Sequence, residues 1–228
     1  TMLNFLLPLE VWDDGPLAAL GKLTQPEIRR RFRRALDDYL LPLDRIFFAW
    51  MPSAENQRWL GQSVQAYIDA SGLAAEDALL QLLIEERLAV LLVFGQGNDA
   101  ICHPFLQHDL GMIGSDGIYF PKSVVHPRVT STAPRILGRA VREWRLFTLE
   151  EAVAKLSSFA AARFGATNRG QIADGNFADL VVFDPATVDD RGTFESPHQP
   201  PVGIEAVTIN GKWIVGEDAS ATFAEEGH

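Results

Sequence analysis

The run Ala89-Val90-Leu91-Leu92-Val93-Phe94 decides the predicted fold, because it follows directly after a helical pattern over residues 75–87. A continuous apolar run of this length is typical of a buried strand. The same alternation occurs just before it, where a strand pattern at 45–50 precedes a helical pattern at 63–70. Alternating strands and helices predict an α/β fold around a parallel sheet.

Further elements are expected on both sides of this region. Pro26 opens a helix through about Leu40, with Thr24 as its cap. The other expected elements are an apolar run at 3–7, a short helix or turn at 98–107, and a short buried strand at 111–114 that ends in Ser115-Asp116-Gly117.

The last third of the chain changes character. Helices are expected at 135–144 and 148–162, the second with Thr148 and Glu151 as a capping box. A strand at 178–184 and a hairpin at 207–215 that turns on Asn210-Gly211 follow. Because turn residues replace the helical period near 165–170, two domains are predicted, residues 1–165 and residues 166–228.

Composition excludes several classes of protein. The chain has 228 residues, 47% hydrophobic and 22% charged, as in an ordinary globular protein. Its net charge of -10 disfavours nucleic acid and anionic membrane surfaces as partners. The longest apolar stretches fall far short of the ~20 residues that a membrane span needs. The single cysteine, Cys102, excludes an internal disulfide and fits a reducing compartment, so a cytoplasmic location is expected.

Asp116 is the first candidate site residue. It comes just after the strand expected at 111–114, and in β/α barrels catalytic groups project from the C-terminal ends of strands. The alternative is that Asp116 simply caps a turn or the next helix, as Asp in Ser-Asp-Gly usually does.

Arg128 is the second candidate. It lies in the loop after Asp116, with Lys122 and His126 nearby, and an arginine can hold a carboxylate through two parallel hydrogen bonds. This would suit an acidic substrate. The alternatives are a solvated arginine or one that pairs with a neighbouring acid.

Two other groups of residues receive structural interpretations. Cys102, His103 and His108 lack the spacing of a zinc motif, and Cys102 is expected to be a small buried side chain. The arginine-rich run at 29–34 is expected to form the solvent face of a helix, with Ile28 and Phe32 on its apolar stripe.

Several motifs together carry a family resemblance. Residues 170–184, followed by Ile209-Asn210-Gly211, resemble the closing segment of the amidohydrolase superfamily. More narrowly, four motifs resemble the N-acyl-D-amino-acid deacylases, or D-aminoacylases: residues 112–117, His126-Pro127-Arg128, residues 134–138 and residues 190–198. The resemblance is to the C-terminal half of that family only.

This resemblance implies a fold and a chemistry. The fold would be the C-terminal half of a (β/α)8 TIM-like barrel over residues 1–165, followed by a β-sandwich segment over 166–228. The family binds one or two zinc ions at the barrel mouth. Asp116 matches the aspartate that ligates metal and acts as general base, taking a proton from the metal-bound water and passing it to the leaving amine. Arg128 matches the arginine that holds the substrate's α-carboxylate, and Ser115 is assigned to substrate binding beside it.

The resemblance also implies what this half would need. The family's His-x-His and its other metal ligands belong to the N-terminal half, so the expected partners are an N-acyl amino acid substrate and that missing half or a partner subunit. A homo-oligomer is a further possibility, because a half barrel would expose strand edges.

Three functions remain open. The first is the C-terminal portion of a metal-dependent deacylase. The second is a related cyclic amidase, dihydroorotase-like or hydantoinase-like, because Val129-Thr130-Ser131-Thr132 replaces the aromatic-Gly-aromatic sequence of the family after Arg128. The third is a non-catalytic remnant that serves as a scaffold.

Overall fold

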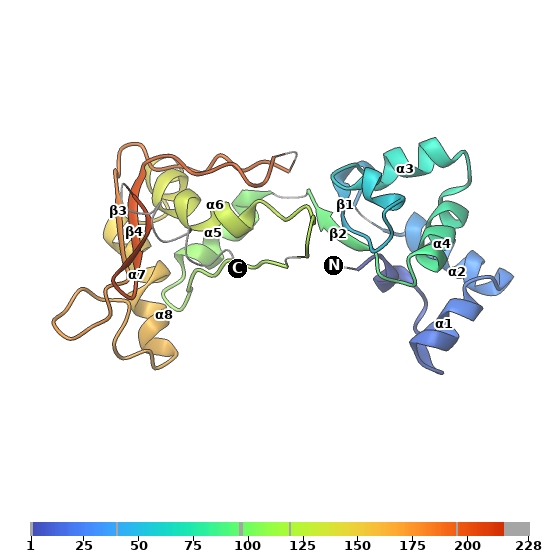
Figure 1. The fold of residues 1–228 in the computed structure, drawn as a ribbon, viewed down its shortest axis with the longest axis horizontal. Helices are drawn as coiled ribbons and strands as arrows, with labels where there is room; N and C mark the ends of the chain where they lie inside the picture. The colour runs from blue at the N-terminus through green and yellow to red at the C-terminus, as the bar shows by residue number, and fades with distance from the viewer. Residues whose placement is uncertain (1, 40, 96–97, 119, 195, 217–228) are drawn as a thin grey trace. The chain divides into compact units, whose positions relative to one another are not determined.

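The computed structural model describes residues 2–39, 41–95, 98–118, 120–194 and 196–216. The chain divides into two compact units, drawn in Figure 1. The first unit comprises Thr1–Gly97 and Ile118–His126, and the second comprises Asn98–Gly117 and Pro127–His228. The predicted boundary at 165 lies inside the second unit and remains a prediction.

The first unit contains short helices around one strand pair. Its elements are the 3-10 segments η1 (Leu3–Leu6), η2 (Leu9–Trp12), η3 (Leu43–Arg45) and η4 (Asn56–Trp59), the helices α1 (Pro16–Lys22), α2 (Pro26–Asp37), α3 (Val64–Ser71) and α4 (Ala75–Glu85), and the strands β1 (Ile46–Trp50) and β2 (Leu91–Phe94). The helices predicted at 63–70 and 75–87 are confirmed, and Gly72 ends α3 in the left-handed conformation that glycine adopts most easily.

The start of α2 differs in detail from the prediction. Its N-cap is Gln25, whose side chain makes no capping hydrogen bond, and the Thr24 hydroxyl instead donates to the carbonyl of Gly21. The helix ends at Asp37, and the predicted end at Leu40 lies outside the described residues. Pro26 in the first turn therefore starts this helix without the predicted threonine cap.

The parallel sheet predicted from the alternating pattern is wrong for the described residues. β1 and β2 pair antiparallel, with Ile46 opposite Phe94 and Phe48 opposite Leu92. The apolar run at 3–7 forms η1 and not a strand. Continuous hydrophobicity predicts that a segment is buried, but strand direction depends on partners far away in the sequence.

The core of the first unit joins both helical regions to the strands. Phe32 of α2, Phe48 of β1 and Leu79 and Leu83 of α4 are fully buried in one cluster. The arginine-rich face of α2 is largely exposed as predicted, but four of its arginines, Arg29, Arg30, Arg31 and Arg33, pair with acids. Arg29 donates to Asp77 of α4 at 2.6 Å, which links the two helices.

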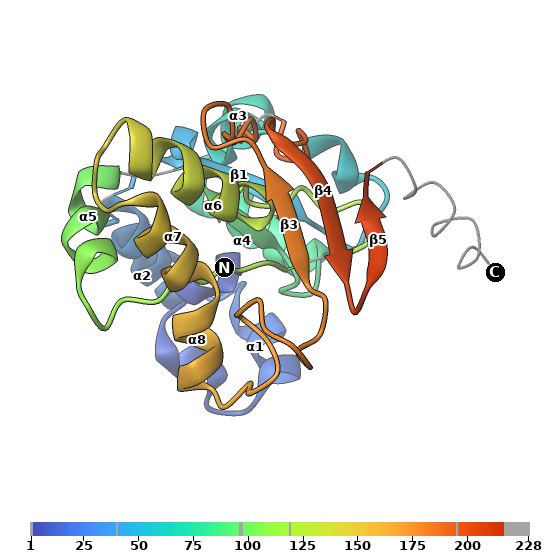
Figure 2. The same ribbon diagram turned by 90° about the vertical axis from the view of Figure 1, so that its left-hand side faces the viewer.

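The second unit combines helices with a small sheet. Its elements are α5 (Asp99–Gln107), α6 (Arg128–Arg135), the π-helical turn η5 (Ile136–Ala140), α7 (Leu149–Leu156), α8 (Ser158–Arg163), and the strands β3 (Leu180–Phe183), β4 (Ile204–Ile209) and β5 (Lys212–Val215). The three strands form one antiparallel sheet in the order β3-β4-β5, and Figure 2 shows them side by side.

Local signals predicted this unit well. The capping box of Thr148 and Glu151 is present at the start of α7. The hairpin turns on Asn210 and Gly211, both with positive φ (51° and 78°), which is the geometry of a type I′ turn.

Two predictions in this unit are wrong. The run at 111–114 forms no strand in the described residues, and the backbone N–H of Ile113 donates instead to the carbonyl of Lys155 at 3.2 Å. The helix predicted from residue 135 begins at Arg128, because β-branched residues and Pro134 hide its first two turns from a propensity argument.

The core of this unit lies between helices and sheet. Ile136, Leu137, Ala140, Ala152 and Val188 form a buried cluster, against which Phe183 and Ile204 of the sheet pack. No helix of the described residues is long and apolar enough to cross a membrane.

An ion pair closes the sheet near the hairpin turn. The Asp179 carboxylate accepts from the backbone N–H of Asn210 at 2.7 Å and pairs with Arg169, whose guanidinium lies 4.2 Å from the Phe177 ring centroid. The hydrogen bond from Asn210, and then that from Arg169, hold the pKa of Asp179 below its usual value.

This lowered pKa predicts an acid-dependent contribution to stability. A carboxylate whose folded pKa is depressed stabilises the fold above its unfolded pKa of about 3.9, and that stabilisation is lost as pH falls through the folded pKa. The stability difference between wild type and Asp179→Asn is therefore expected above about pH 4 and should close below it. Urea unfolding midpoints between pH 6 and pH 2 measure it, with Asp174→Asn as the control for loss of one charge in the same region. A difference that stays constant with pH would contradict this assignment.

Candidate functional site

The two candidate residues lie in contact in the second unit. An ion pair joins Arg128 Nη2 to Asp116 Oδ2, and Arg128 Nε donates to the backbone carbonyl of Asp116 at 3.4 Å. The side chains are 49% and 64% exposed, respectively, so both groups remain accessible to solvent. The guanidinium fork therefore engages one residue through two of its nitrogens.

Different kinds of backbone present these two side chains. Arg128 is the first residue of α6, which Pro127 precedes as N-cap, whereas Asp116 lies in an irregular segment after Gly114 and Ser115. The chain between them, Ile118–His126, belongs to the first unit.

The pairing resolves one question that the sequence left open. Of the alternatives for Arg128, the structure shows pairing with a neighbouring acid, and that acid is the other candidate residue. A substrate carboxylate that bound Arg128 would have to replace Asp116 as its partner. Such an exchange would leave the Asp116 carboxylate without this cation and available to accept a proton.

The remaining predicted residues, Ser115, Lys122 and His126, divide between the two units. Ser115 is exposed next to Asp116. Lys122 and His126 belong to the segment of the first unit, where the backbone N–H of Val124 donates to the carbonyl of Ala49 at 2.8 Å and Phe120 stacks on Trp50. Ser115 therefore lies next to the pair by chain adjacency, whereas Lys122 and His126 belong to the other unit.

Potential metal ligands do not gather in the part of the chain that the structure describes, where no group of three or more His, Cys, Asp or Glu residues could hold an ion. His103 packs on the Trp144 ring, with centroids 4.9 Å apart, and His108 Nδ1 accepts from the backbone N–H of Leu110. At the candidate site itself the donor set is the single carboxylate of Asp116. Since a zinc ion takes about four ligands, Asp116 alone could supply only one of them and the described residues do not complete a zinc site.

The prediction that Cys102 is buried is wrong. The Cys102 side chain is exposed on α5. Ile101 and Phe105 of the same helix are 67% and 73% exposed. A small apolar side chain is buried only when another element covers its helix face, and none of the described residues covers this one.

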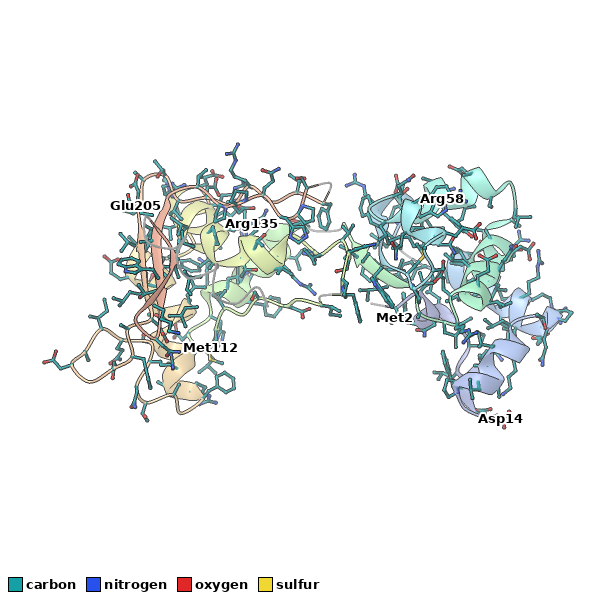
Figure 3. All side chains as sticks on the ribbon, in the orientation of Figure 1. Met2, Asp14, Arg58, Met112, Arg135 and Glu205 are labelled. Carbon is teal, nitrogen blue, oxygen red and sulfur yellow. The ribbon has the colours of Figure 1, made fainter. Side chains whose placement is uncertain are left out.

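Sequence reasoning missed one charged pair near the site. Asp190, whose side chain is 2% exposed, accepts from Arg135 Nη2 at 2.8 Å and from Arg135 Nε at 3.3 Å. Arg135 lies on α6 and is labelled in Figure 3. The partners are 55 residues apart, so no local pattern could pair them.

Comparison with known proteins places the site in a family context. Residues 106–215, which include Asp116 and Arg128, match the amidohydrolase family model. The chain is 51% identical over 108 residues to a D-aminoacylase of Alcaligenes xylosoxydans xylosoxydans, covering 47% of this chain and 22% of that protein. It is 36% identical over 167 residues to an N-acyl-D-aspartate deacylase of the same organism, covering 71% of this chain and 33% of that protein.

Solved structures show the same relationship. An N-acyl-D-glutamate deacylase from Bordetella bronchiseptica, complexed with zinc and a phosphonate mimic of the tetrahedral intermediate, matches with a TM-score of 0.65 and 34% identity over 75% of this chain and 35% of that one. A D-aminoacylase with a binuclear metal centre matches with a TM-score of 0.65 and 30% identity over 86% and 44%. The chain thus spans about a third of the curated relatives' length or less, and under half of these structures. The resemblance expected from the sequence motifs is confirmed over this portion.

Proposed function

We propose, because residues 106–215 match the amidohydrolase family model, that this chain is the C-terminal part of a zinc-dependent hydrolase that deacylates N-acyl-D-amino acids. The observation that carries the proposal is that the matched segment contains both Asp116 and Arg128, and that these two side chains lie in contact. A carboxylate next to a guanidinium provides a proton acceptor beside a binding group for a carboxylate, which are the two functions that this substrate requires.

In this proposal Arg128 binds the α-carboxylate of the substrate, with Ser115 beside it. Asp116 takes a proton from the water that attacks the acyl carbonyl and delivers it to the leaving amine. Substrate binding by Arg128 and proton transfer by Asp116 are coupled, because a substrate carboxylate that pairs with Arg128 releases Asp116 from its ion pair.

The architecture proposed for the complete protein is a (β/α)8 barrel with a β-sandwich module. Residues 1–165 would contribute to the barrel and residues 166–228 to the sandwich. The antiparallel pairing of β1 with β2 departs from the parallel strands of such a barrel. The parallel strands of a barrel would have to come from outside the described residues. The exposed side chains of Leu180, Val181 and Val182 on β3 support a sheet that further strands would cover.

Zinc enters the proposal through the solved relative that contains it. One or two ions would bind with Asp116 as one ligand, and the other ligands would come from a further part of the same protein or from a partner subunit. That complementing portion is the partner the proposal requires, besides the N-acyl amino acid.

A substrate screen tests the proposal. The native protein that contains this chain is captured with an antibody and assayed on N-acetyl-D-glutamate, N-acetyl-D-aspartate, N-acetyl-D-leucine and their L enantiomers, and on a hydantoin and dihydroorotate. We expect hydrolysis of the D enantiomers and little hydrolysis of the others. Turnover of only the cyclic compounds would favour a cyclic amidase, and turnover of none by the zinc-loaded protein would favour a non-catalytic scaffold.

A further inference from the structure

The helix that carries Arg128 is fastened along one side to a distant part of the chain. This part, called here the buttress segment, consists of residues 185–194 and 196–198. The Thr130 hydroxyl donates to the carbonyl of Pro197 at 2.9 Å, and Arg142 donates to the carbonyls of Val188 at 2.7 Å and Pro185 at 3.0 Å. The contacts therefore run from the first turn of α6 to beyond the end of η5.

Two glycines allow the buttress segment to approach the helix closely. A Cβ on Gly138 of η5 would lie 2.3 Å from the carbonyl oxygen of Val188, and one on Gly192 would lie 2.5 Å from Ser131 Oγ. Both distances are too short for any side chain, so the helix and the segment touch backbone to backbone at one point and backbone to hydroxyl at the other.

A buried charge lies between these two contacts. Asp190 Oδ2 accepts two hydrogen bonds from Arg135, and Arg139 Nη2 lies 3.7 Å from Asp190 Oδ1. Since a buried carboxylate that loses its partner is strongly unfavourable, this pair tolerates little displacement of the helix against the segment. Neither arginine has a role in the proposed chemistry.

The helix needs such support. α6 has eight residues, its N-cap Pro127 makes no side-chain capping bond, and Pro134 lies inside it. Its first five residues include Val129, Thr130 and Thr132, all β-branched, and even together with η5 it is short for a helix that is stable alone in water. Its position therefore depends on tertiary contacts, among them those to the buttress segment.

We propose that Asp190 is a positioning residue, which acts through Arg135 and the buttress segment to hold α6 so that Arg128 meets the carboxylate of the substrate. This inference rests on the proposed function for its substrate. It assigns to the buttress segment a role in carboxylate recognition without direct contact with the substrate.

The test compares two substrates in the native protein. Asp190→Asn is expected to raise KM for the N-acyl-D-amino acid by roughly 10-fold or more while kcat changes less than about 3-fold, since positioning and not chemistry is lost. With the α-carboxamide analogue of the same substrate, which offers Arg128 no carboxylate, the variant and the wild type should behave alike. Asp179→Asn removes a carboxylate from another arginine pair of the same unit that does not touch α6, and it should leave both KM values unchanged.

Two outcomes would overturn the inference. One is an unchanged KM for the N-acyl-D-amino acid, and the other is an equal loss on both substrates, which would indicate general damage to the fold. Should Asp190→Asn fail to fold, Arg135→Lys keeps the charge but loses the guanidinium fork, and the same selective rise in KM is expected of it.

Hydrogen exchange separates this inference from the proposed function. The amides of residues 130–133 and of Arg135 should exchange faster in Asp190→Asn than in wild type or Asp179→Asn. Unchanged exchange would overturn the anchoring role even in an active enzyme. Absence of any hydrolysis by the wild type would overturn the proposed function, whereas faster exchange would still support the anchoring of α6 by Asp190.

Discussion

Replacement of Asp116 by Asn in the native protein is expected to lower kcat for N-acyl-D-amino acids by roughly 10²- to 10⁴-fold, the usual effect of removing a general base. Asparagine keeps the size of the side chain but cannot accept the proton. The substitution also removes the ion pair with Arg128, but both side chains are about half exposed or more, and exposed pairs contribute about 0–1 kcal/mol to stability. A large loss of turnover with an almost unchanged unfolding midpoint is therefore the expected combination.

The matched control for this variant is Asp109→Asn. Asp109 is an exposed acid in the same unit, seven positions before Asp116. The Asp109→Asn variant should retain wild-type turnover, measured as the initial rate of amine release at saturating substrate. Wild-type turnover in Asp116→Asn would exclude Asp116 as the base and, with it, the mechanism proposed for this site.

Replacement of Arg128 by Met is expected to raise KM for N-acyl-D-amino acids by roughly 10- to 100-fold, because a charge-assisted hydrogen-bonded pair contributes about 1.5–3 kcal/mol. Arg128→Lys keeps the positive charge but loses the fork, so a smaller rise is expected. The α-carboxamide analogue should show neither effect. Steady-state kinetics on the two substrates measure the difference.

Arg163→Met serves as the control for loss of one exposed arginine, since Arg163 lies at the end of α8 and outside the site. Equal sensitivity of the acid and its carboxamide to Arg128→Met would show that Arg128 does not recognise the carboxylate. A lower KM for the acid in this variant would show that the internal pair with Asp116 opposes substrate binding.

Local chemistry explains the parts of the fold that the sequence predicted. The end of α3 at Gly72, the Thr148 capping box and the Asn210-Gly211 turn each depend on a few adjacent residues, and each is present. The apolar pattern of residues 75–94 likewise predicted both a helix and a buried strand. These features require no knowledge of distant partners.

Features that depend on distant partners were predicted less well. The direction of β2 depends on β1, more than 40 positions away, and the run at 111–114 forms no strand among the described residues because no strand pairs with it. Cys102 is exposed because its helix face is uncovered. Hydrophobicity indicates a tendency to be buried, but the covering element decides the outcome.

At the candidate site, too, the identity of residues could be predicted from local motifs, whereas their pairing depends on distant parts of the chain. Asp116 and Arg128 were both identified from motifs, but their mutual ion pair was only one of several possibilities for Arg128. The pair of Arg135 with Asp190 joins positions 55 residues apart and has no signature in either neighbourhood. Asp190 is buried only because α6 and the buttress segment pack together, which neither local sequence indicates.

We propose that metal ligands from outside these 228 residues complete the site on this chain. The most direct test is the intact mass of the native product, captured with an antibody against this chain and measured together with any polypeptide that accompanies it. The account predicts either one polypeptide about twice as large or this chain in a complex with a partner that contains a His-x-His sequence. Capture of this chain alone, at the mass of 228 residues and without a partner, would contradict it.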